Sequence, residues 1–437
     1  MNSLIWTSRD GAPRLARTVD AMQYDDLAEL LLPDDLLVTF RERAAGYDRD
    51  NRFFHETLTD LRSRGYLRLF VPQNMGGLGA SILDVTRLQR RLAGADPAAA
   101  LGINMHLVVT GAALLATRRG LDPARRILAE AARDVLFAFG ISEAGNDVML
   151  FDSWSVATPD GGGGYRVSGT KIFTSMSPAW DRLIVHAKVE GAGDDGTDRL
   201  VFGILGRGDG VEVQDDWDTH GMRASQSCTT VLSEARLAAG DILDLTPVGP
   251  TQDPLRFGIF GCFELTIASV YCGLAERAVA LTSDIVAGRA SRSKGIMHSD
   301  DPDIRWRLAD AAIGLDGAVL QIERLSADLD AAGSPDAAPG TRDHGPRWYL
   351  QFSGVKSRTT QVALRAVDQC LRSAGGRHYS HDSELERLSR DVRASMYQPS
   401  DEESVHASYA RALLGDIGSQ EPGSESCHSC DAADRAI

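Results

Sequence analysis

A block of short β-type segments lies between two long helical regions, and this order constrains the fold more than any other feature of the chain. Residues 137–245 contain brief runs of branched and aromatic residues, such as 183–187 and 200–204, separated by glycine-rich turns such as 160–164. Short runs bounded by turn clusters are typical of strands. Helices first, strands next and helices last predict an α+β fold with segregated layers, not alternating βα units.

Helical periodicity covers most of the remaining chain. Apolar residues recur at helix-like spacing from about residue 33 to residue 136. A long apolar helix starts near residue 255, and further helices are expected at 303–330 and 346–373, with a loop at 332–346. The predicted divisions are an irregular N-terminal extension (1–35), an N-terminal α-helical domain (36–136), a middle β-domain (137–247), a C-terminal α-helical bundle (248–415) and a disordered tail (416–437).

The chain is acidic, and its apolar content is that of a globular protein. Of its 437 residues 43% are apolar, which is enough for a large core divided over several domains. The formal net charge of −15 argues against nucleic-acid binding, because phosphate contacts need clustered Lys and Arg. A pocket can still be locally basic in such a protein, so an anionic small molecule is compatible with this charge.

Cysteine usage and the N-terminus predict a cytoplasmic protein. The six cysteines are spread out and mostly lie in apolar runs, which is typical of buried thiols rather than of a disulfide framework. Cys427 and Cys430 with the histidine between them offer too few ligands for zinc, which needs about four, so no metal site is expected. No basic region precedes an apolar run at the N-terminus, and no uninterrupted apolar stretch of about 18 residues predicts a membrane span.

Five motifs follow one another in a recognisable order. They are a glycine-rich loop at 72–79, a strand and polar loop at 139–147, a strand pair at 167–175, a turn at 220–225, and a Gly-Gly turn followed by an Arg-Asp-x-Arg run within 371–400. Together they resemble the acyl-CoA dehydrogenase superfamily over most of the chain. The resemblance implies an N-terminal helical domain, a central β-barrel-like domain and a C-terminal four-helix bundle, with FAD as the cofactor and FMN as the alternative.

The resemblance also implies which residues surround the flavin ring and the substrate. Ser142 matches a threonine whose hydroxyl meets the flavin pyrimidine ring, a role that suits a group able to donate or accept. Phe173 would pack on the isoalloxazine face, and Ser175 matches a hydroxyl near flavin N5. Arg223 and Ser225 would line the site where flavin and substrate meet. The residues implied at the flavin ring are, in chain order, Phe139, Ile141, Ser142, Phe173 and Ser175.

A second group of residues is implied at the cofactor phosphates. In the family an arginine grips the FAD pyrophosphate by charge-assisted bonds, and Arg289 and Arg292 bracket its position here. Arg372 replaces a family glutamine before the turn formed by Gly375 and Gly376. These residues would place extra positive charge near a phosphate, whereas the alternative is a set of solvated arginines on helix surfaces.

The residue that removes the substrate proton in most family members is missing. The family loop carries a glutamate, but here the loop reads Met-Tyr-Gln-Pro-Ser, and Gln398 or Pro399 stands at the catalytic position, depending on the alignment. An amide has no titratable acceptor near neutral pH, whereas a general base needs a pKa near the working pH. Glu264, in an apolar helical stretch, is the candidate for a displaced base, since burial would raise its pKa. The family position on this helix matches Phe263, one residue before Glu264, and one step along a helix turns a side chain by about 100°, which would normally point Glu264 away from the site. The alternative for Glu264 is therefore a structural ion pair with an arginine at a subunit interface.

Three functions follow from these residues. The first is α,β-dehydrogenation of an acyl thioester, carried on CoA or on a carrier protein, with electrons passing to an acceptor flavoprotein. The second is a flavin-dependent monooxygenase on the same fold, for which a base is dispensable and a flavin reductase supplies reduced flavin for reaction with O₂. The third is a catalytically silent subunit that stabilises an active homologue. The resemblance further implies a homotetramer or homodimer built on the C-terminal bundle.

Overall fold

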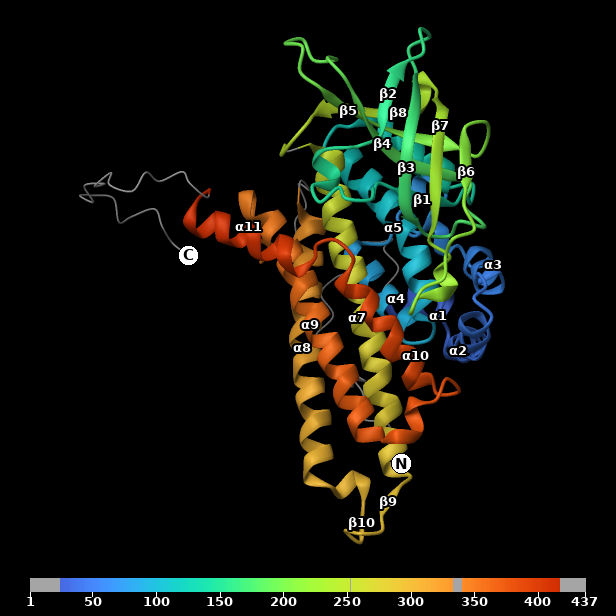
Figure 1. Cartoon of the computed structure of the whole chain (residues 1–437), viewed down its shortest axis with the longest axis vertical. Helices are drawn as coiled ribbons and strands as arrows, with labels where there is room; N and C mark the ends of the chain where they lie inside the picture. The colour runs from blue at the N-terminus through green and yellow to red at the C-terminus, as the bar shows by residue number, and fades with distance from the viewer. Residues whose placement is uncertain (1–23, 252, 333–339, 417–437) are drawn as a thin grey trace, which may run out of the picture.

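The computed structural model describes residues 24–251, 253–332 and 340–416. Figure 1 shows the β-sheet at one end of the molecule, long helices running from it to the opposite end, and the first helices packed at the side. The predicted α+β class is confirmed, with helices before the sheet, the sheet itself and helices after it. The tail that begins at residue 417 lies outside the described residues, and so do Cys427, Cys430 and part of the expected loop (333–339).

Two of the N-terminal helices, α4 and α5, are capped by short polar side chains, Ser81 and Asp96. Helix α4 begins with a capping box, in which Ser81 accepts from the Asp84 backbone N–H and the Asp84 carboxylate accepts in return from Ser81. The N-terminal helices are α1 (Tyr24–Leu31), α2 (Asp34–Arg49), α3 (His55–Ser63), α4 (Ile82–Ala93), α5 (Pro97–Arg118) and α6 (Arg125–Ala131). Helix α1 lies inside the stretch expected to be irregular, because Leu27, Ala28 and Leu31 bury one of its faces.

An eight-stranded sheet follows in the order β6-β7-β3-β2-β4-β5-β8, and β1 pairs in parallel with β4. The pairing of β3 with β7 shifts register between Lys171 and Thr174, and Phe173 has a positive φ of 57° within this bulge. Bulges re-aim side chains, and this one turns Phe173 outward. The strands are β1 (Phe137–Gly140), β2 (Val156–Pro159), β3 (Tyr165–Thr174), β4 (Arg182–Val189), β5 (Arg199–Gly206), β6 (Val211–Val213), β7 (Cys228–Leu237) and β8 (Ile242–Pro247).

The C-terminal helices form the four-helix bundle that the resemblance implies. Helix α7 packs against α9, α8 and α10, and also against α4 and α5 of the N-terminal region. The hairpin of β9 (Ala290–Ser291) and β10 (Ile296–Met297) lies at the end of the bundle far from the main sheet (Figure 1). The bundle helices are α7 (Pro254–Ala287), α8 (Pro302–Ala331), α9 (Trp348–Ala374) and α10 (Glu384–Asp391), and α11 (Glu402–Leu414) follows them.

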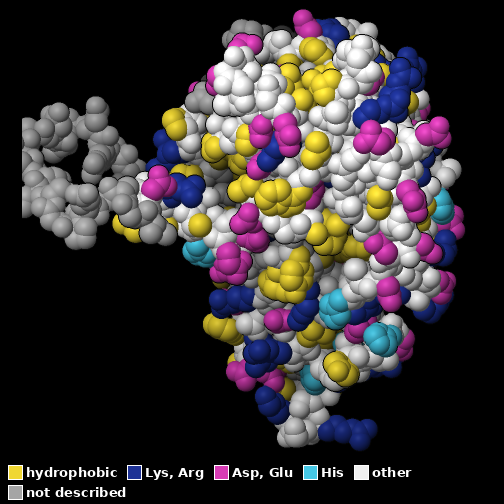
Figure 2. Space-filling view, turned by 45° about the horizontal axis from the view of Figure 1, so that its top comes forward, with side chains coloured by type: hydrophobic (Ala, Val, Ile, Leu, Met, Phe, Trp, Pro, Cys, Tyr) yellow, Lys and Arg dark blue, Asp and Glu magenta, His cyan; other side chains and the backbone are white. Residues whose placement is uncertain are grey.

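Two helices form the centre of the core. Helices α5 and α7 are long and apolar enough to cross a membrane by length and composition, but 100% and 94% of their most apolar windows are buried inside the fold. They are therefore core helices, as expected of long apolar segments with no solvent-exposed face. On the face shown in Figure 2, Lys and Arg side chains are interspersed with Asp and Glu, so that face carries no extended basic surface.

Candidate active site

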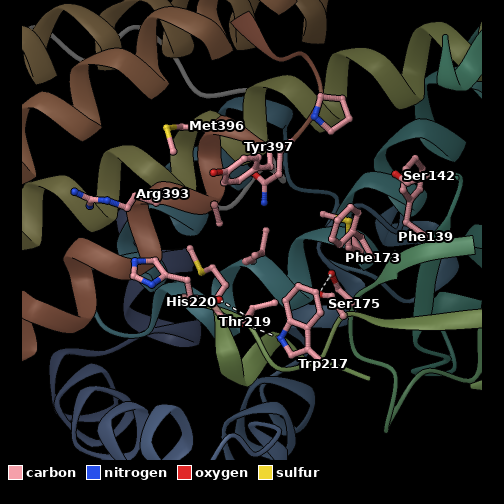
Figure 3. Close-up of a pocket in the computed structure, with 18 of the residues that line it drawn as sticks. Phe139, Ser142, Phe173, Ser175, Trp217, Thr219, His220, Arg393, Met396 and Tyr397 are labelled. Carbon is pink, nitrogen blue, oxygen red and sulfur yellow. Dashed lines mark hydrogen bonds between the residues drawn. The ribbon is translucent and has the colours of Figure 1, made fainter. Parts of the chain in front are cut away.

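A cavity of about 470 Å³ lies where the sheet meets the helices. This volume falls within the range of roughly 300–1,000 Å³ that is typical of small-molecule sites. Segments far apart in the sequence meet there, as Figure 3 shows for ten labelled residues. The cavity is lined by Leu101, Met105, Phe139, Ser142, Phe173, Ser175, Trp217, Thr219, His220, Gly221, Met222, Ser227, Phe263, Arg390, Arg393, Ala394, Met396, Tyr397, Gln398 and Pro399.

Phe173 offers a flat aromatic face to the cavity. The bulge in β3 leaves 52% of its surface exposed, and its ring meets Trp217 edge to face with centroids 6.1 Å apart. In Figure 3, Phe173 and Ser175 lie on one side of the cavity, and Trp217 and Tyr397 lie on opposite sides of its centre. Flat rings stack well on such a surface, so this arrangement fits the isoalloxazine of a flavin.

Three serine hydroxyls form a hydrogen-bonded chain beside Phe173. Ser175 Oγ lies 2.8 Å from Ser227 Oγ, which lies 2.8 Å from Ser225 Oγ (Figure 3 draws the first of these bonds). Ser175 lines the cavity, whereas Ser225 is buried behind it and reaches the site only through Ser227. Ser175 and Ser227 therefore both line the cavity, and Ser225 supports them from behind through its bond to Ser227.

Ser142 lies on the same side of the cavity as Phe139 and Phe173 (Figure 3). Its hydroxyl contacts Met149 Sδ at 3.9 Å, a weak acceptor that leaves the group available to a ligand. Phe139 lines the cavity from β1, and its ring lies 5.9 Å from that of Phe263 on α7. Ile141 is buried in the core between these residues and does not line the cavity. The sequence thus predicts four side chains that the structure brings together here, and a fifth that supports them.

A buried ion pair fixes the loop that follows Ser142. Lys171 Nζ donates to Glu143 Oε1 at 2.7 Å and to the His186 carbonyl at 2.8 Å, and neither charged side chain is exposed. Glu143 also accepts from the Trp154 and Ser155 backbone N–H groups. Burial alone would raise the pKa of Glu143, but Lys171 and these hydrogen bonds hold that pKa well below its ordinary value. Burial lowers the pKa of Lys171 to about 8.

The loop at 396–399 closes the cavity from the C-terminal side, and a buried lysine holds it. Lys356 Nζ on α9 donates to the carbonyls of Ser395 at 2.8 Å, Gln398 at 2.6 Å and Ser400 at 3.0 Å. All three of its protons are thereby used. Burial lowers the pKa of Lys356 to about 8, against the opposing effect of Glu264.

Glu264 lies behind this loop rather than in the cavity. Its Oε1 accepts from Ser400 Oγ at 2.7 Å, its side chain is buried, and burial raises its pKa, as the sequence predicts. The next residue towards the N-terminus, Phe263, takes the position that faces the cavity. Gln398 does line the cavity. No Asp or Glu lines this cavity within the part of the chain that the structure describes.

Arg223, which the sequence predicts at the substrate, and the cavity-lining Arg390 are both held by acidic or carbonyl partners. Arg223 donates to the Asp48 carbonyl at 3.0 Å and to Asp218 Oδ1 at 2.8 Å, so its guanidinium ties the wall to α2 and does not line the cavity. Arg390 lines the cavity but pairs with both carboxylate oxygens of Asp48 and with Glu386. The predicted substrate contact of Arg223 is therefore replaced by a structural one.

The residues expected at the cofactor phosphates lie at the far end of the bundle. Arg289 donates to the Ala374 carbonyl, beside Gly375. The other predicted residues of this group are exposed to solvent, namely Arg292, Arg372 and Gly376. A helix rises about 1.5 Å per residue, so Phe263 and Ala287, at the end of α7, lie roughly 36 Å apart. This separation exceeds the length of an extended FAD. One chain cannot present both groups of residues to a single flavin.

Several residues of the site were not predicted from the sequence. Leu101 and Met105 lie on α5, whose continuous apolar run hides which side chains face a cavity. Trp217 and Tyr397 stand in polar loops. Lys356 reads as a surface lysine in an amphipathic helix, although it is only 1% exposed. The aromatic side chains of Trp217 and Tyr397, in otherwise polar loops, could have indicated a binding site, since aromatic residues are enriched at binding surfaces.

Family models match both helical regions of the chain. The model described as "Acyl-CoA dehydrogenase, N-terminal domain" matches residues 39–118, and "Acyl-CoA dehydrogenase, C-terminal domain" matches residues 265–400. The second range contains the loop at 396–399 and Lys356. Both matches agree with the resemblance seen in the motifs.

Curated relatives include oxygen-transferring enzymes. The chain is 31% identical over 80% of its length to L-evernosamine nitrososynthase from Micromonospora sp., covering 81% of that protein. It is 28% identical to the putative acyl-CoA dehydrogenase YdbM of Bacillus subtilis (86% of this chain, 93% of the relative). It is 27% identical to dibenzothiophene monooxygenase of Mycolicibacterium goodii (82% and 85%).

A solved structure of similar fold contains a flavin. The structure of KijD3 in complex with FMN and dTDP-3-amino-2,3,6-trideoxy-4-keto-3-methyl-D-glucose superposes with a TM-score of 0.74 at 28% identity. The match covers 90% of this chain and 95% of that chain. The likeness therefore extends over both helical regions and the sheet that hold the cavity.

Proposed function

The chain belongs to the acyl-CoA dehydrogenase family of flavoprotein oxidoreductases, and from this premise we propose that it is a flavin-dependent monooxygenase. The observation that carries the proposal is the cavity itself, which has an aromatic ring face at Phe173 but no lining carboxylate among the described residues. The names of the relatives support it, since nitrososynthases and a dibenzothiophene monooxygenase stand among them.

Dehydrogenation of a thioester is hard to reconcile with this cavity. That reaction needs a base within hydrogen-bond reach of the proton it removes. Gln398 occupies the wall where a base would act, and its amide has no basic site near neutral pH. Glu264 lies behind the loop and is already bonded to Ser400 Oγ, so it acts on the position of the loop.

An oxygen transfer places different demands on the site. Reduced flavin, when bound, supplies the two electrons that activate O₂. In one turnover an oxygen atom forms a bond to the substrate, the O–O bond breaks, and the second oxygen atom leaves as water with two protons from the reduced flavin. The chain must hold the ring against Phe173 and keep bulk water away, which the surrounding apolar residues Leu101, Met105 and Phe263 do.

We propose a small amine as the substrate, with dTDP-linked amino sugars as the first candidates. The nitrososynthase relative and the ligand of the KijD3 structure support this choice. The cavity supports it chemically. Because no carboxylate among the described residues lines the cavity to pair with an ammonium ion, the cavity favours the neutral amine, whose lone pair can accept an oxygen atom. Sulfur compounds such as dibenzothiophene have a comparable lone pair and form the second set to test.

FMN suffices for this arrangement. The ring side of the site is complete within one chain, whereas the arginines expected at an FAD pyrophosphate lie at the other end of α7. An FAD could reach such a group only on a second copy of the chain. We propose that FMN, delivered in reduced form by a flavin reductase, is the working cofactor in the cytoplasm, where the buried free thiols of the described cysteines stay reduced.

Acyl thioesters are expected to leave the bound flavin oxidised. Protein loaded with FMN, and separately with FAD, is mixed anaerobically with a panel of acyl-CoA thioesters while the visible flavin absorption is recorded. We expect no loss of absorption, because no base is available to start the reaction. Dithionite, added at the end, should bleach the same samples and so control for reducible flavin. Bleaching by a thioester would contradict the monooxygenase and restore the dehydrogenase.

A second copy of the chain is expected to pack on α8. Trp306, Ile313 and Leu320 are 63%, 73% and 69% exposed and recur every seven residues, so they form one apolar stripe along the helix. Ile313→Glu should break the oligomer into smaller species in light scattering coupled to size exclusion. Leu245→Glu, at an exposed apolar residue on β8, is the matched control and should leave the mass unchanged. A monomeric wild-type protein would contradict this expectation.

A further inference from the structure

Two buried polar atoms behind the cavity lack a well-formed hydrogen bond. Gln398 Oε1 and Tyr271 Oη are both buried, and neither has a partner of good geometry within the described residues. The two side chains are nonetheless neighbours. Burial raises the pKa of the Tyr271 phenol, whose hydroxyl lies beside the Gln398 side chain. A buried hydroxyl without a partner is costly, so a hydrogen bond that joins these two groups is favourable.

The burial of Gln398 Oε1 indicates the direction of that bond. The raised pKa keeps the phenol protonated, so Tyr271 Oη can donate. An amide accepts only through its oxygen, since its nitrogen carries two donor protons. Gln398 Oε1 is buried while the Gln398 side chain lines the cavity, so a bond from Tyr271 on α7 to this oxygen leaves the NH₂ group facing the cavity.

The main chain of Gln398 is held as firmly as its side chain. Lys356 Nζ donates to the Gln398 carbonyl at 2.6 Å and to the carbonyls of the flanking residues Ser395 and Ser400. Glu264, on the same helix as Tyr271, accepts from Ser400 Oγ at 2.7 Å and lies across from Lys356 as its counter-charge. Lysine, tyrosine and glutamate thus set the position of one amide group without touching the cavity themselves.

We propose that the Gln398 side-chain amide is the hydrogen-bond donor of the oxygen-transfer step, and that Tyr271 and Lys356 are its positioning residues. The inference rests on the proposed function. When the O–O bond breaks, the departing oxygen atom takes on negative charge before it leaves as water, and a fixed N–H donor stabilises such charge without reorganisation. The same position in a dehydrogenase would need an acceptor of protons, so a donor here matches the absence of a base.

The test compares three variants of purified protein supplied with FMN, a flavin reductase, NADH, O₂ and a dTDP-linked amino sugar. Gln398→Leu removes the donor, Tyr271→Phe removes the group that orients it, and Gln361→Leu, on the exposed part of α9, is the control. The measured quantity is oxygenated product formed relative to hydrogen peroxide released. We expect Gln398→Leu to lower this ratio by about 10²-fold, as loss of one such donor does elsewhere. Tyr271→Phe should lower it by less, and the control should match wild type.

Two further readouts separate a role of the donor from loss of structure. FMN affinity, measured by fluorescence, should stay within about threefold of wild type in every variant. That limit is a change of about 0.7 kcal/mol or less in the binding free energy of oxidised FMN. In flavin-free protein, the ultraviolet resonance Raman bands of Tyr271 are identified as those that disappear in Tyr271→Phe. These bands should indicate a hydrogen bond donated by Tyr271 in wild type and no such bond in Gln398→Leu. Unchanged Tyr271 Raman signals, or a wild-type product ratio in Gln398→Leu, would overturn the inference. If wild type forms no oxygenated product at all, the proposed function fails instead.

Discussion

Replacing Lys171 by methionine is expected to lower the free energy of unfolding by about 3–5 kcal/mol, because the change leaves the carboxylate of Glu143 buried without its counter-charge. Lys171 Nζ lies 2.7 Å from Glu143 Oε1, and the two side chains are 0% and 2% exposed. Glu143 in turn holds the backbone of Trp154 and Ser155, so the loop after Ser142 loses its anchor. Urea unfolding followed by circular dichroism measures the loss.

Lys188→Met is the matched control for this prediction. Lys188 Nζ makes an equally short contact of 2.7 Å with Asp152, but these side chains are 21% and 24% exposed. Solvent screens that pair, so the control should cost below about 1 kcal/mol. Equal losses in the two variants would show that the Lys171–Glu143 pair has no special structural role.

The pH dependence of the same variant has a definite sign. The folded-state pKa of Glu143 lies below its ordinary value of 4.5, so the pair contributes stability above that pH and loses it as pH falls below 4.5. The difference in unfolding free energy between wild type and Lys171→Met should therefore shrink in acid. A difference that grows below pH 4.5 would contradict the ion-pair explanation.

Product formation is expected to depend wholly on reduced flavin and O₂. With a flavin reductase, NADH and FMN present, an amine substrate should be oxygenated in air. Leaving out the reductase, or working without oxygen, should reduce product to background, because none of the described residues that line the cavity can supply the two electrons or the oxygen atom. Dehydrogenation would show the opposite pattern, since it needs an electron acceptor and no O₂. Product in the absence of the reductase would contradict the prediction.

Much of the fold follows from local patterns. The alternation of short strands and turns places the sheet between two helical regions, and the predicted ring-side residues Phe139, Ser142, Phe173 and Ser175 do line one cavity. These four lie close in sequence to the strands that carry them, so local spacing is enough to bring them together. Local spacing cannot predict which side chains of α5 and α7 line the cavity, or that Lys356 of α9 holds the loop at 396–399.

The misplaced residues share one physical cause, which is that long-range partners decide where a charged side chain points. Arg223 is drawn to Asp48, far away in the sequence, and leaves the cavity. Glu264 turns towards Ser400 and Lys356, while its neighbour Phe263 faces the site. A helix pattern alone places neighbouring residues about 100° apart but does not say which one meets the cavity. Arg289 and Arg292, just after α7, bracket the position of the family arginine in sequence, yet the length of that helix separates them from the ring site.

Heavy-isotope labelling of molecular oxygen tests the central claim most directly. The complete system of full-length protein, flavin reductase, NADH and FMN is run with a dTDP-linked amino sugar under labelled O₂ in unlabelled water, and the product is examined by mass spectrometry. A monooxygenase should place one labelled oxygen atom on the nitrogen of the product for each turnover, with the other in water. Dibenzothiophene, run in parallel, tests sulfur as the acceptor atom. Absence of label from every product, together with flavin bleaching by an acyl thioester, would contradict the account and identify a dehydrogenase.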